Sequence, residues 1–310
     1  MSTPALILEI PPSEAELSAP SRLAAQIGGI SLGLTAESPD LDLVSDVSLQ
    51  NFLVDSPHCD MEFSVFWRDE LEGIAGDLLF DSEGLWQLFS DSENYRFQFK
   101  ADHLGKQPYK QVYAARDFMR GRIELRRPYF PPGRAVNALE YPLDELLWIH
   151  RLARGEGVEV HACGVVTPDG CGLLLAGHSG AGKSTSARLW ARLPGARVLS
   201  DDRIILRREN GRVRMYGTPW HGDAGVAEAA ACPLNSILVL AQADSNTLRR
   251  LSPAVASAEL FARSFVPHHS PDGISFVLGF FERLTREIPC FEFGFVPDFT
   301  AVEALLHERF

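Results

Sequence analysis

The sequence lacks any long apolar run. No stretch reaches the ~18 consecutive apolar residues that a membrane-spanning helix requires. We also expect no secretory signal, because the opening MSTPALILEIPPSEAELS has no basic segment followed by an apolar one. These absences argue against a membrane as partner, and they predict a cytoplasmic protein.

An excess of positive charge is missing as well. Lysine and arginine together number 29, against 41 aspartate and glutamate residues, so the formal net charge is −12. Because a protein that binds nucleic acid usually carries a basic surface, we expect no nucleic acid partner. A small, local basic site is still compatible with this composition.

Cysteine is scarce and follows no motif. No two of the five cysteines have the CxxC spacing of a zinc or redox site, and their odd number does not fit a disulfide framework. The sequence therefore predicts core thiols in a reducing compartment. These residues are Cys59, Cys163, Cys171, Cys232 and Cys290.

What is present falls into two regions of different character. Between about residues 63 and 127, short alternating or aromatic runs are separated by Gly, Pro and acidic clusters, which is typical of strands and turns. The segment RRPYFPPGRAVN, residues 126–137, then interrupts regular structure. We therefore expect a smaller β-rich domain over residues 1–134 and a second domain over residues 135–310.

Helical and strand patterns alternate in the second region, so its expected fold class is α/β. The pair Asn210-Gly211 indicates a tight hairpin turn. The sequence predicts helices over 143–154, 184–193, 252–265 and 273–288 and from about residue 298, and strands over 158–166, 173–176, 196–200, 235–243 and 290–295.

A glycine-rich loop follows the apolar strand expected at 173–176. Its sequence, GHSGAGKS, fits the pattern GxxxxGK[ST], in which backbone N–H groups and a lysine contact phosphate and a hydroxyl contacts magnesium. The pattern predicts a P-loop that binds ATP or GTP with Mg²⁺. The predicted nucleotide-binding residues are Gly177, His178, Ser179, Gly180, Ala181, Gly182, Lys183, Ser184 and Thr185.

Two adjacent acids, Asp201 and Asp202, follow Lys183 by eighteen and nineteen positions. This distance leaves room for a helix, a turn and a strand. If that strand lies beside the one feeding the loop, its carboxyl end reaches the phosphate side of the sheet. A carboxylate there can organise magnesium or accept a hydroxyl proton. Because successive strand residues point to opposite faces, the two acids need not share a function. A polar turn is the alternative.

His161 lies on the strand expected just before the loop strand. A histidine on an alternating strand is more often structural than functional. If the two strands form a hairpin around TPDG, however, His161 faces the same end of the sheet as the two aspartates.

The stretch from VHACGVV through GHSGAGKSTSARLW to VLSDDR resembles the catalytic domain of the HPr kinase/phosphorylase family, which is related to ATP-type phosphoenolpyruvate carboxykinases. The resemblance covers about residues 157–222 and implies a P-loop-containing catalytic domain of that type. It also implies that His161, Lys183, Asp201 and Asp202 belong to the catalytic machinery and that Ser184 with Asp202 binds the metal. Because members of the family form hexamers, it makes a homo-oligomer an expectation too.

One segment departs from the family pattern. The Glu-x-Arg-Gly-Leu-Gly-type stretch that follows the acid pair in enzymes acting on HPr is replaced here by GTPWHGDAG. HPr is therefore not expected as the substrate, and phosphorolysis has no support. Trp220 and His221 of this segment either contact a substrate or anchor a turn.

The sequence as a whole predicts an ATP-dependent kinase. It would transfer the γ-phosphoryl group to a hydroxyl, with serine of a protein or peptide as the expected acceptor. Asp201 would accept or orient the acceptor proton, and His161 would support that carboxylate or the phosphate. Two alternatives stay open: a small-molecule kinase, which a long arginine-rich lid would favour, and a regulator that binds nucleotide without turning it over.

Overall fold

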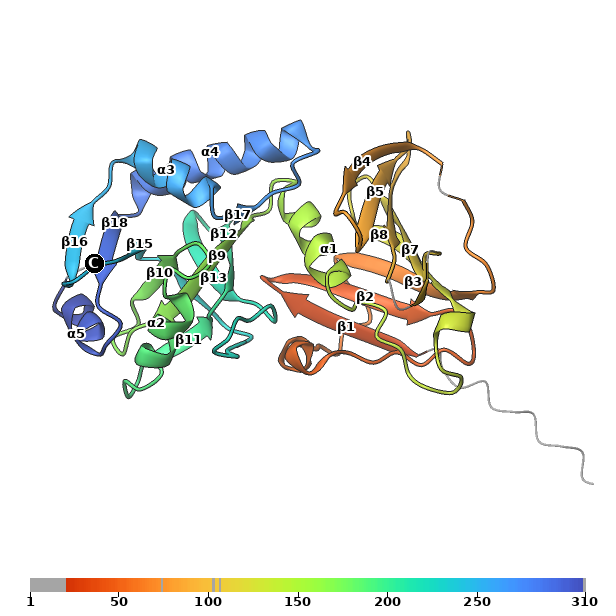
Figure 1. Cartoon of the computed structure of the whole chain (residues 1–310), viewed down its shortest axis with the longest axis horizontal. Helices are drawn as coiled ribbons and strands as arrows, with labels where there is room; N and C mark the ends of the chain where they lie inside the picture. Colours follow the sequence, from red (N-terminus) through yellow and green to blue (C-terminus); the bar gives the residue numbers. More distant parts are fainter. Residues whose placement is uncertain (1–20, 74, 102–103, 106, 309–310) are drawn as a thin grey trace, which may run out of the picture.

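The computed structural model describes residues 21–73, 75–101, 104–105 and 107–308. These residues form two lobes that lie side by side along the long axis of the molecule (Figure 1). Each lobe is built on its own β-sheet, and helices are few in the first lobe and more numerous in the second. The protein is therefore a mixed α/β structure.

The first lobe is an eight-stranded sheet with the strand order β1-β2-β3-β8-β7-β6-β5-β4. Its pairings are antiparallel except for β2 with β3 and β3 with β8. All residues of the edge strand β4 are exposed. The strands are β1 Arg22–Ile27, β2 Ile30–Ala36, β3 Met61–Arg68, β4 Asp77–Asp81, β5 Trp86–Ser90, β6 Asn94–Phe99, β7 Lys110–Ala115 and β8 Arg120–Arg126.

The strands that the sequence predicts between residues 63 and 127 are confirmed as β3, β5, β6, β7 and β8. Strands β1, β2 and β4 were not predicted. The turn between β1 and β2 consists of Gly28 and Gly29, both with positive φ, and a Cβ at Gly28 would lie 2.9 Å from Ile205 of the second lobe. Glycine is needed here both for the turn and for the close approach of the lobes.

The second lobe is a ten-stranded sheet. Its main order is β14-β13-β12-β9-β10-β15-β18-β16, and β11 and β17 pair with β9. Only β10 with β15 and β15 with β18 are parallel. The strands are β9 Val158–Val166, β10 Gly172–Ala176, β11 Arg197–Ser200, β12 Arg203–Glu209, β13 Arg212–Gly217, β14 Ala231–Pro233, β15 Ser236–Gln242, β16 Thr247–Arg250, β17 Ser264–Phe265 and β18 Cys290–Phe295.

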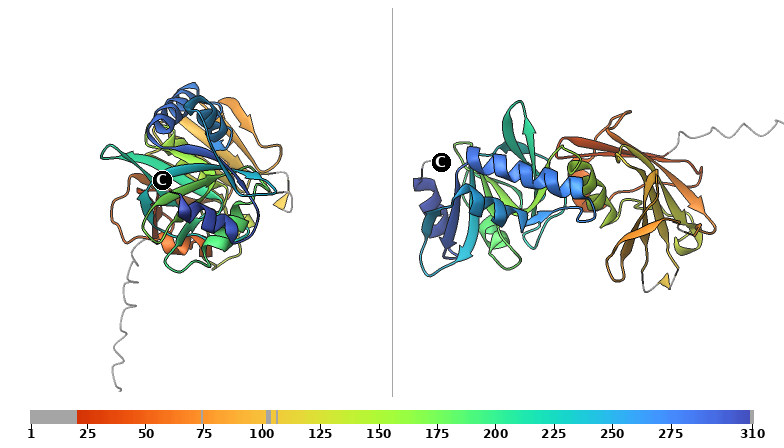
Figure 2. Two further views of the ribbon diagram at one scale, coloured as in Figure 1. Left: turned by 90° about the vertical axis from the view of Figure 1, so that its left-hand side faces the viewer. Right: turned by 90° about the horizontal axis from the view of Figure 1, so that it is seen from above.

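Helices cover both faces of the second sheet (Figures 1 and 2). Leu174 and Ala176 pack on the side of α3 and α4, whereas Leu173 and Leu175 pack on the side of α2 and α5. This alternation is the period of two that a strand buried on both faces requires. The helices are α2 Lys183–Trp190, α3 Pro253–Phe261, α4 Pro271–Glu287 and α5 Thr300–His307.

The expected hairpin between β12 and β13 is confirmed, with positive φ at both Asn210 and Gly211. The expected neighbour of β11 is wrong. β11 pairs with β9, and since β9 is antiparallel to both β10 and β11, β11 lies one strand away from β10 and runs in the same direction. The carboxyl end of β11 nevertheless reaches the end of the sheet at which β10 enters the glycine-rich loop.

Helix α1, Leu143–Leu152, belongs to the core of the first lobe. Leu147 and Trp148 are fully buried there, and the Trp148 indole N–H donates to the Ile27 carbonyl at 2.9 Å. The helix was expected to lead into the second domain, and it does precede β9, but its apolar side chains pack on the first sheet. The division of the chain at residues 134 and 135 stays a prediction.

The cysteines only partly follow the expectation of core thiols. Cys163, Cys232 and Cys290 are buried, whereas Cys59 and Cys171 are half-buried, Cys171 at the edge of the core around α2. All five are free thiols. Among the described residues, no helix has both the length and the apolar character needed to cross a bilayer.

The place of α1 in the first core can be tested by Leu147→Ala. Removing this fully buried side chain leaves a cavity, so the free energy of unfolding should fall by about 2–5 kcal/mol. Denaturant titration followed by circular dichroism measures the change. Leu278→Ala on α4, where the leucine is 48% exposed, is the matched control and should change stability by less than ~0.5 kcal/mol. Equal effects would contradict the assignment of α1 to the core.

Candidate functional site

The loop of residues 177–182, called the glycine loop below, joins β10 to α2. Gly180 and Gly182 have φ values of +79° and +105°, in the left-handed region that favours glycine. A Cβ at Gly182 would also collide with the ring of Phe295. At its start the loop is tied to β9, because the Gly177 N–H donates to the His161 carbonyl at 3.2 Å. The glycines are therefore required by the backbone geometry of the loop.

The amino end of α2 is open to a ligand. Gly182 is the N-cap, and no side chain in the part of the chain that the structure describes caps the first-turn N–H groups of the helix. Lys183, the first residue of α2, is 5% exposed, and its ammonium donates to the carbonyls of Gly177 at 3.0 Å and His178 at 3.2 Å. Burial lowers the pKa of Lys183. A helix amino end with an adjacent cation attracts anions.

Asp201 lies beneath this loop and is completely buried. Its Oδ2 accepts hydrogen bonds from the Ser184 hydroxyl at 2.9 Å and from the Ala224 N–H at 2.9 Å. Its Oδ1 accepts from the N–H groups of Gly222 at 3.0 Å and Val226 at 3.3 Å. Each oxygen thus accepts two hydrogen bonds, and the carboxylate is held by groups of the surrounding structure. The resemblance described above implies a metal pair of Ser184 with Asp202, but the observed bond of Ser184 is to Asp201.

Asp202 occupies a different environment, and its side chain is 23% exposed. Its Oδ1 is 2.8 Å from the His161 Nε2 and 3.8 Å from the Lys183 ammonium, and its Oδ2 accepts from Arg203. An ionised carboxylate only accepts hydrogen bonds, so the proton of this contact lies on the His161 Nε2. The two neighbouring acids therefore point into different surroundings, as their strand-like spacing suggested.

The pKa of Asp202 is low. Burial alone would raise it, but the His161 hydrogen bond and the positive charges of Arg203 and Lys183 outweigh that effect. The carboxylate is consequently ionised at neutral pH.

A cavity of about 380 Å³ brings most of the predicted residues together. Gly177, His178, Ala181 and Asp201 are not among the residues that line it; Asp201 supports its wall from below. The lining residues are His161, Ser179, Gly180, Gly182, Lys183, Ser184, Thr185, Arg188, Asp202, Gly222 and Asp223.

The sequence reasoning missed Arg188 and Asp223 of this cavity. Arg188 lies one helical turn after Ser184 on α2, and its guanidinium donates to the Asp223 carbonyl at 2.8 Å. The i,i+4 spacing from Ser184 could have identified Arg188. No local signal could have placed Asp223, because long-range hydrogen bonds to Asp201 and Arg188 bring residues 222–226 to the cavity.

Trp220 and His221 have different environments. Trp220 is 8% exposed, packs against the first core and donates its indole N–H to Asp144 at 2.8 Å. Burial raises the pKa of this Asp144 to about 7. His221 is exposed and its ring Nδ1 lies 3.1 Å from the Gly222 carbonyl. Of the two interpretations given above, the contacts of Trp220 support the anchoring of a turn.

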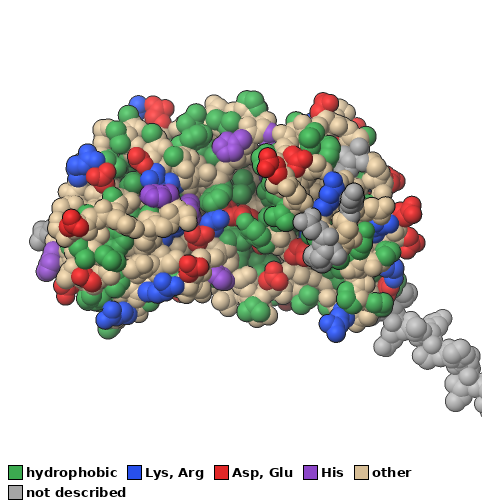
Figure 3. Space-filling view, in the orientation of Figure 1, with side chains coloured by type: hydrophobic (Ala, Val, Ile, Leu, Met, Phe, Trp, Pro, Cys, Tyr) green, Lys and Arg blue, Asp and Glu red, His purple; other side chains and the backbone are tan. Residues whose placement is uncertain are grey.

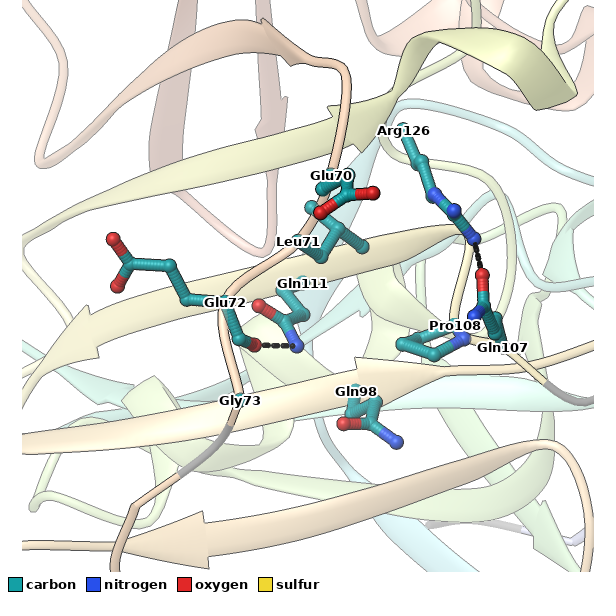
Figure 4. A pocket seen from close by; sticks show the side chains of 9 residues that line it. All are labelled: Glu70, Leu71, Glu72, Gly73, Gln98, Gln107, Pro108, Gln111 and Arg126. Atoms are coloured by element: carbon teal, nitrogen blue, oxygen red, sulfur yellow. Dashed lines mark hydrogen bonds between the residues drawn. The ribbon is translucent and has the colours of Figure 1, made fainter.

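A second cavity, of about 270 Å³, lies on the first lobe (Figure 4). It contains none of the predicted site residues. Its cation, Arg126, bonds to Gln107 and Tyr129, its Gln111 amide donates to the Glu72 carbonyl, and Glu70 and Glu72 also line it. This composition is unsuited to a highly charged anion such as a triphosphate.

No model of a known protein family matches the sequence, and no curated protein does. Among solved structures, the HPr(Ser) kinase/phosphatase from Coxiella burnetii is similar with a TM-score of 0.24 and 18% identity, covering 49% of this chain and 99% of that chain. A TM-score this low supports no inference about activity.

The anchoring role of Asp201 predicts that Asp201→Asn destabilises the protein. The amide would turn its own donors toward main-chain N–H groups, and buried hydrogen bonds to a charged group are worth about 1.5–3 kcal/mol each. We expect the free energy of unfolding, measured by urea titration, to fall by at least ~2 kcal/mol. Asp223→Asn, at an exposed position in the same segment, should leave it within ~0.5 kcal/mol. If both variants match the parent, Asp201 is not an anchor.

Proposed function

We propose that the protein binds a nucleoside triphosphate, ATP or GTP, with Mg²⁺ in the 380 Å³ cavity and transfers its γ-phosphoryl group to a hydroxyl. The expected acceptor is a serine of a protein or peptide. One observation carries the proposal: the glycine loop, Lys183 and a reachable, ionised carboxylate bonded to a histidine line the same cavity. The likeness of residues 157–222 to HPr kinase/phosphorylase sequences points in the same direction.

The glycine loop, the amino end of α2 and Lys183 would hold the phosphates. Main-chain N–H groups and one ammonium group neutralise charge without a large side-chain rearrangement. Lys183 now bonds the carbonyls of Gly177 and His178, so its ammonium group is already directed at the loop that would surround the phosphate. Arg188 on the same helix adds a second cation to the cavity wall.

The side chains in the cavity fit Mg²⁺, which prefers oxygen ligands and usually takes only one or two carboxylates beside the phosphates. Within the described ranges, no group of three or more His, Cys, Asp and Glu side chains could hold a metal by itself. The Ser184 hydroxyl gives its hydrogen to Asp201 and keeps its lone pairs for a cation, and Asp223 lines the same wall. When bound, the ion would neutralise charge on the phosphates.

We propose that Asp202 accepts the proton of the acceptor hydroxyl. The sequence had favoured Asp201 for this role. Asp201 is buried and has four donors, whereas Asp202 is partly exposed, lines the cavity and is ionised. His161 would hold the Oδ1 atom of Asp202 in place through its Nε2–H group. Positioning and charge neutralisation would supply most of the rate enhancement, and the base would add about 10²–10⁴-fold.

The arginines after β15 weigh against a small-molecule kinase with an arginine-rich lid. Arg249 pairs with Glu292, Arg263 pairs with Glu259, and the Arg250 guanidinium lies 5.1 Å from the centre of the Phe291 ring. Each of these arginines therefore contacts a residue of its own lobe. Arg249 and Arg250 lie on β16, and Arg263 lies between α3 and β17. A protein or peptide acceptor, which needs no such lid, is the better-supported substrate class.

Lys183→Ala should weaken the binding of ATP with Mg²⁺ by about tenfold to a hundredfold, because a charged hydrogen bond to phosphate is lost. Isothermal titration calorimetry measures this affinity. Lys100→Ala, which removes a lysine of the first lobe bonded to Gln87, is the matched control and should bind as the parent does. Unchanged affinity in Lys183→Ala would refute the phosphate-binding loop.

Asp202→Asn should keep nucleotide affinity within roughly tenfold of the parent and lower turnover by about 10² or more, since the amide cannot accept the proton. Turnover is measured as nucleotide hydrolysis and as transfer of a γ-labelled phosphoryl group to proteins of a cell extract, read by mass spectrometry. Asp169→Asn in an exposed turn controls for the loss of one charge. A parent that binds nucleotide but never turns it over would indicate a regulator.

A further inference from the structure

The guanidinium of Arg203 lies at the junction of the two lobes. Figure 3 shows this face of the molecule hollowed between the lobes, with charged side chains among hydrophobic ones. The Arg203 Nε donates to the Glu145 Oε1 at 2.8 Å, and another nitrogen, Nη1, donates to the Asp202 Oδ2. One planar side chain therefore joins the ionised carboxylate of the cavity to a carboxylate of α1.

Glu145 is a firm anchor because of the helix that carries it. Its side chain is 7% exposed, and its neighbours on α1, Leu147 and Trp148, are fully buried in the core of the first lobe. Arg203 itself is 16% exposed, and its guanidinium lies 4.1 Å from the centre of the Phe265 ring. A guanidinium held by a buried partner and a ring face has few orientations left.

A third carboxylate, Glu159, lies 3.5 Å from the Arg203 Nε and is completely buried. Neither of its oxygens has a hydrogen-bond partner among the described residues. Burial raises the pKa of Glu159 well above its usual value, and the charge of Glu145 adds to this effect. Arg203 makes its hydrogen bonds to Glu145 and Asp202, so Glu159 is the more weakly held of its three acidic neighbours.

We infer that Arg203 is a positioning residue. Glu145 of the first lobe holds Arg203, and Arg203 in turn orients Asp202. The inference rests on the proposed function, in which Asp202 accepts the acceptor proton. With Oδ2 fixed by Arg203, the Oδ1 atom is directed at His161 and Lys183, on the cavity side. The first lobe then acts on the chemistry of the cavity without contributing a residue to its lining.

Arg207 provides a matched control on the same strand. Its side chain is 17% exposed, and it also joins the lobes, because its Nη1 donates to the Gly28 carbonyl at 2.7 Å and its Nε to the Glu156 carbonyl at 3.1 Å. It is not one of the residues lining the cavity. A loss that comes only from weakened contact between lobes should therefore be the same at Arg203 and Arg207.

The kinetic test compares Arg203→Met, Arg203→Lys and Arg207→Met in the full chain, with folding checked by circular dichroism. Arg203→Met should lower kcat for nucleotide turnover by at least ~10-fold, with the KM for ATP within ~3-fold of the parent. Arg203→Lys, which keeps the positive charge but lacks the planar guanidinium that spans the two carboxylates, should have an intermediate kcat. Arg207→Met should keep the parent's kcat. Equal kcat values in the two methionine variants would overturn the inference.

A second measurement does not depend on turnover. With ¹⁵N-labelled histidine, the Nε2 resonance of His161 reports its hydrogen bond to Asp202. Arg203→Met should shift this resonance and speed the exchange of its proton, and Arg207→Met should leave both as in the parent. A parent-like His161 resonance in Arg203→Met would refute the positioning role. A parent without any transfer, combined with the expected shift, would refute the proposed function alone.

Discussion

The buried carboxylate of Asp201 is the point on which the arrangement of the candidate site depends. Placing a charge in the interior costs several kcal/mol, and this cost is offset only when every lone pair finds a donor. Here the donors come from the first turn of α2 and from residues 222–226. One side chain thus joins the end of β11, the helix after the glycine loop and a distant loop, and it brings the walls of the cavity together.

Much of this site could be predicted from the sequence. The glycine loop follows β10 and precedes α2 because its spacing encodes the turn, and the strand-like alternation of Asp201 and Asp202 implied two different environments. Which acid is buried could not be predicted. That depends on hydrogen bonds from residues more than twenty positions further along the chain, and no local pattern specifies such contacts.

The order of the strands was harder to predict from the sequence than the strands and helices themselves. A helix followed by a strand favours a parallel strand directly beside the one that precedes the helix. Here β9 lies between β10 and β11, because β9 pairs with β10 along one edge and with β11 and β12 along the other. The period of α1 predicted a helix correctly, yet it could not reveal on which sheet the apolar face packs. Amphipathic patterns do not specify which long-range partner a strand or an apolar helix face contacts.

The contact of the Gly28-Gly29 turn with Ile205, together with the Arg207 bond to the Gly28 carbonyl, has a consequence for the history of the chain. An unrelated domain that replaced the first lobe would have to supply a glycine turn and an accepting carbonyl at the same place. It would also need a helix carrying a carboxylate opposite Arg203. The lobes are therefore poor candidates for shuffling as independent modules, and substitutions in one should be tolerated mainly when the other changes with it.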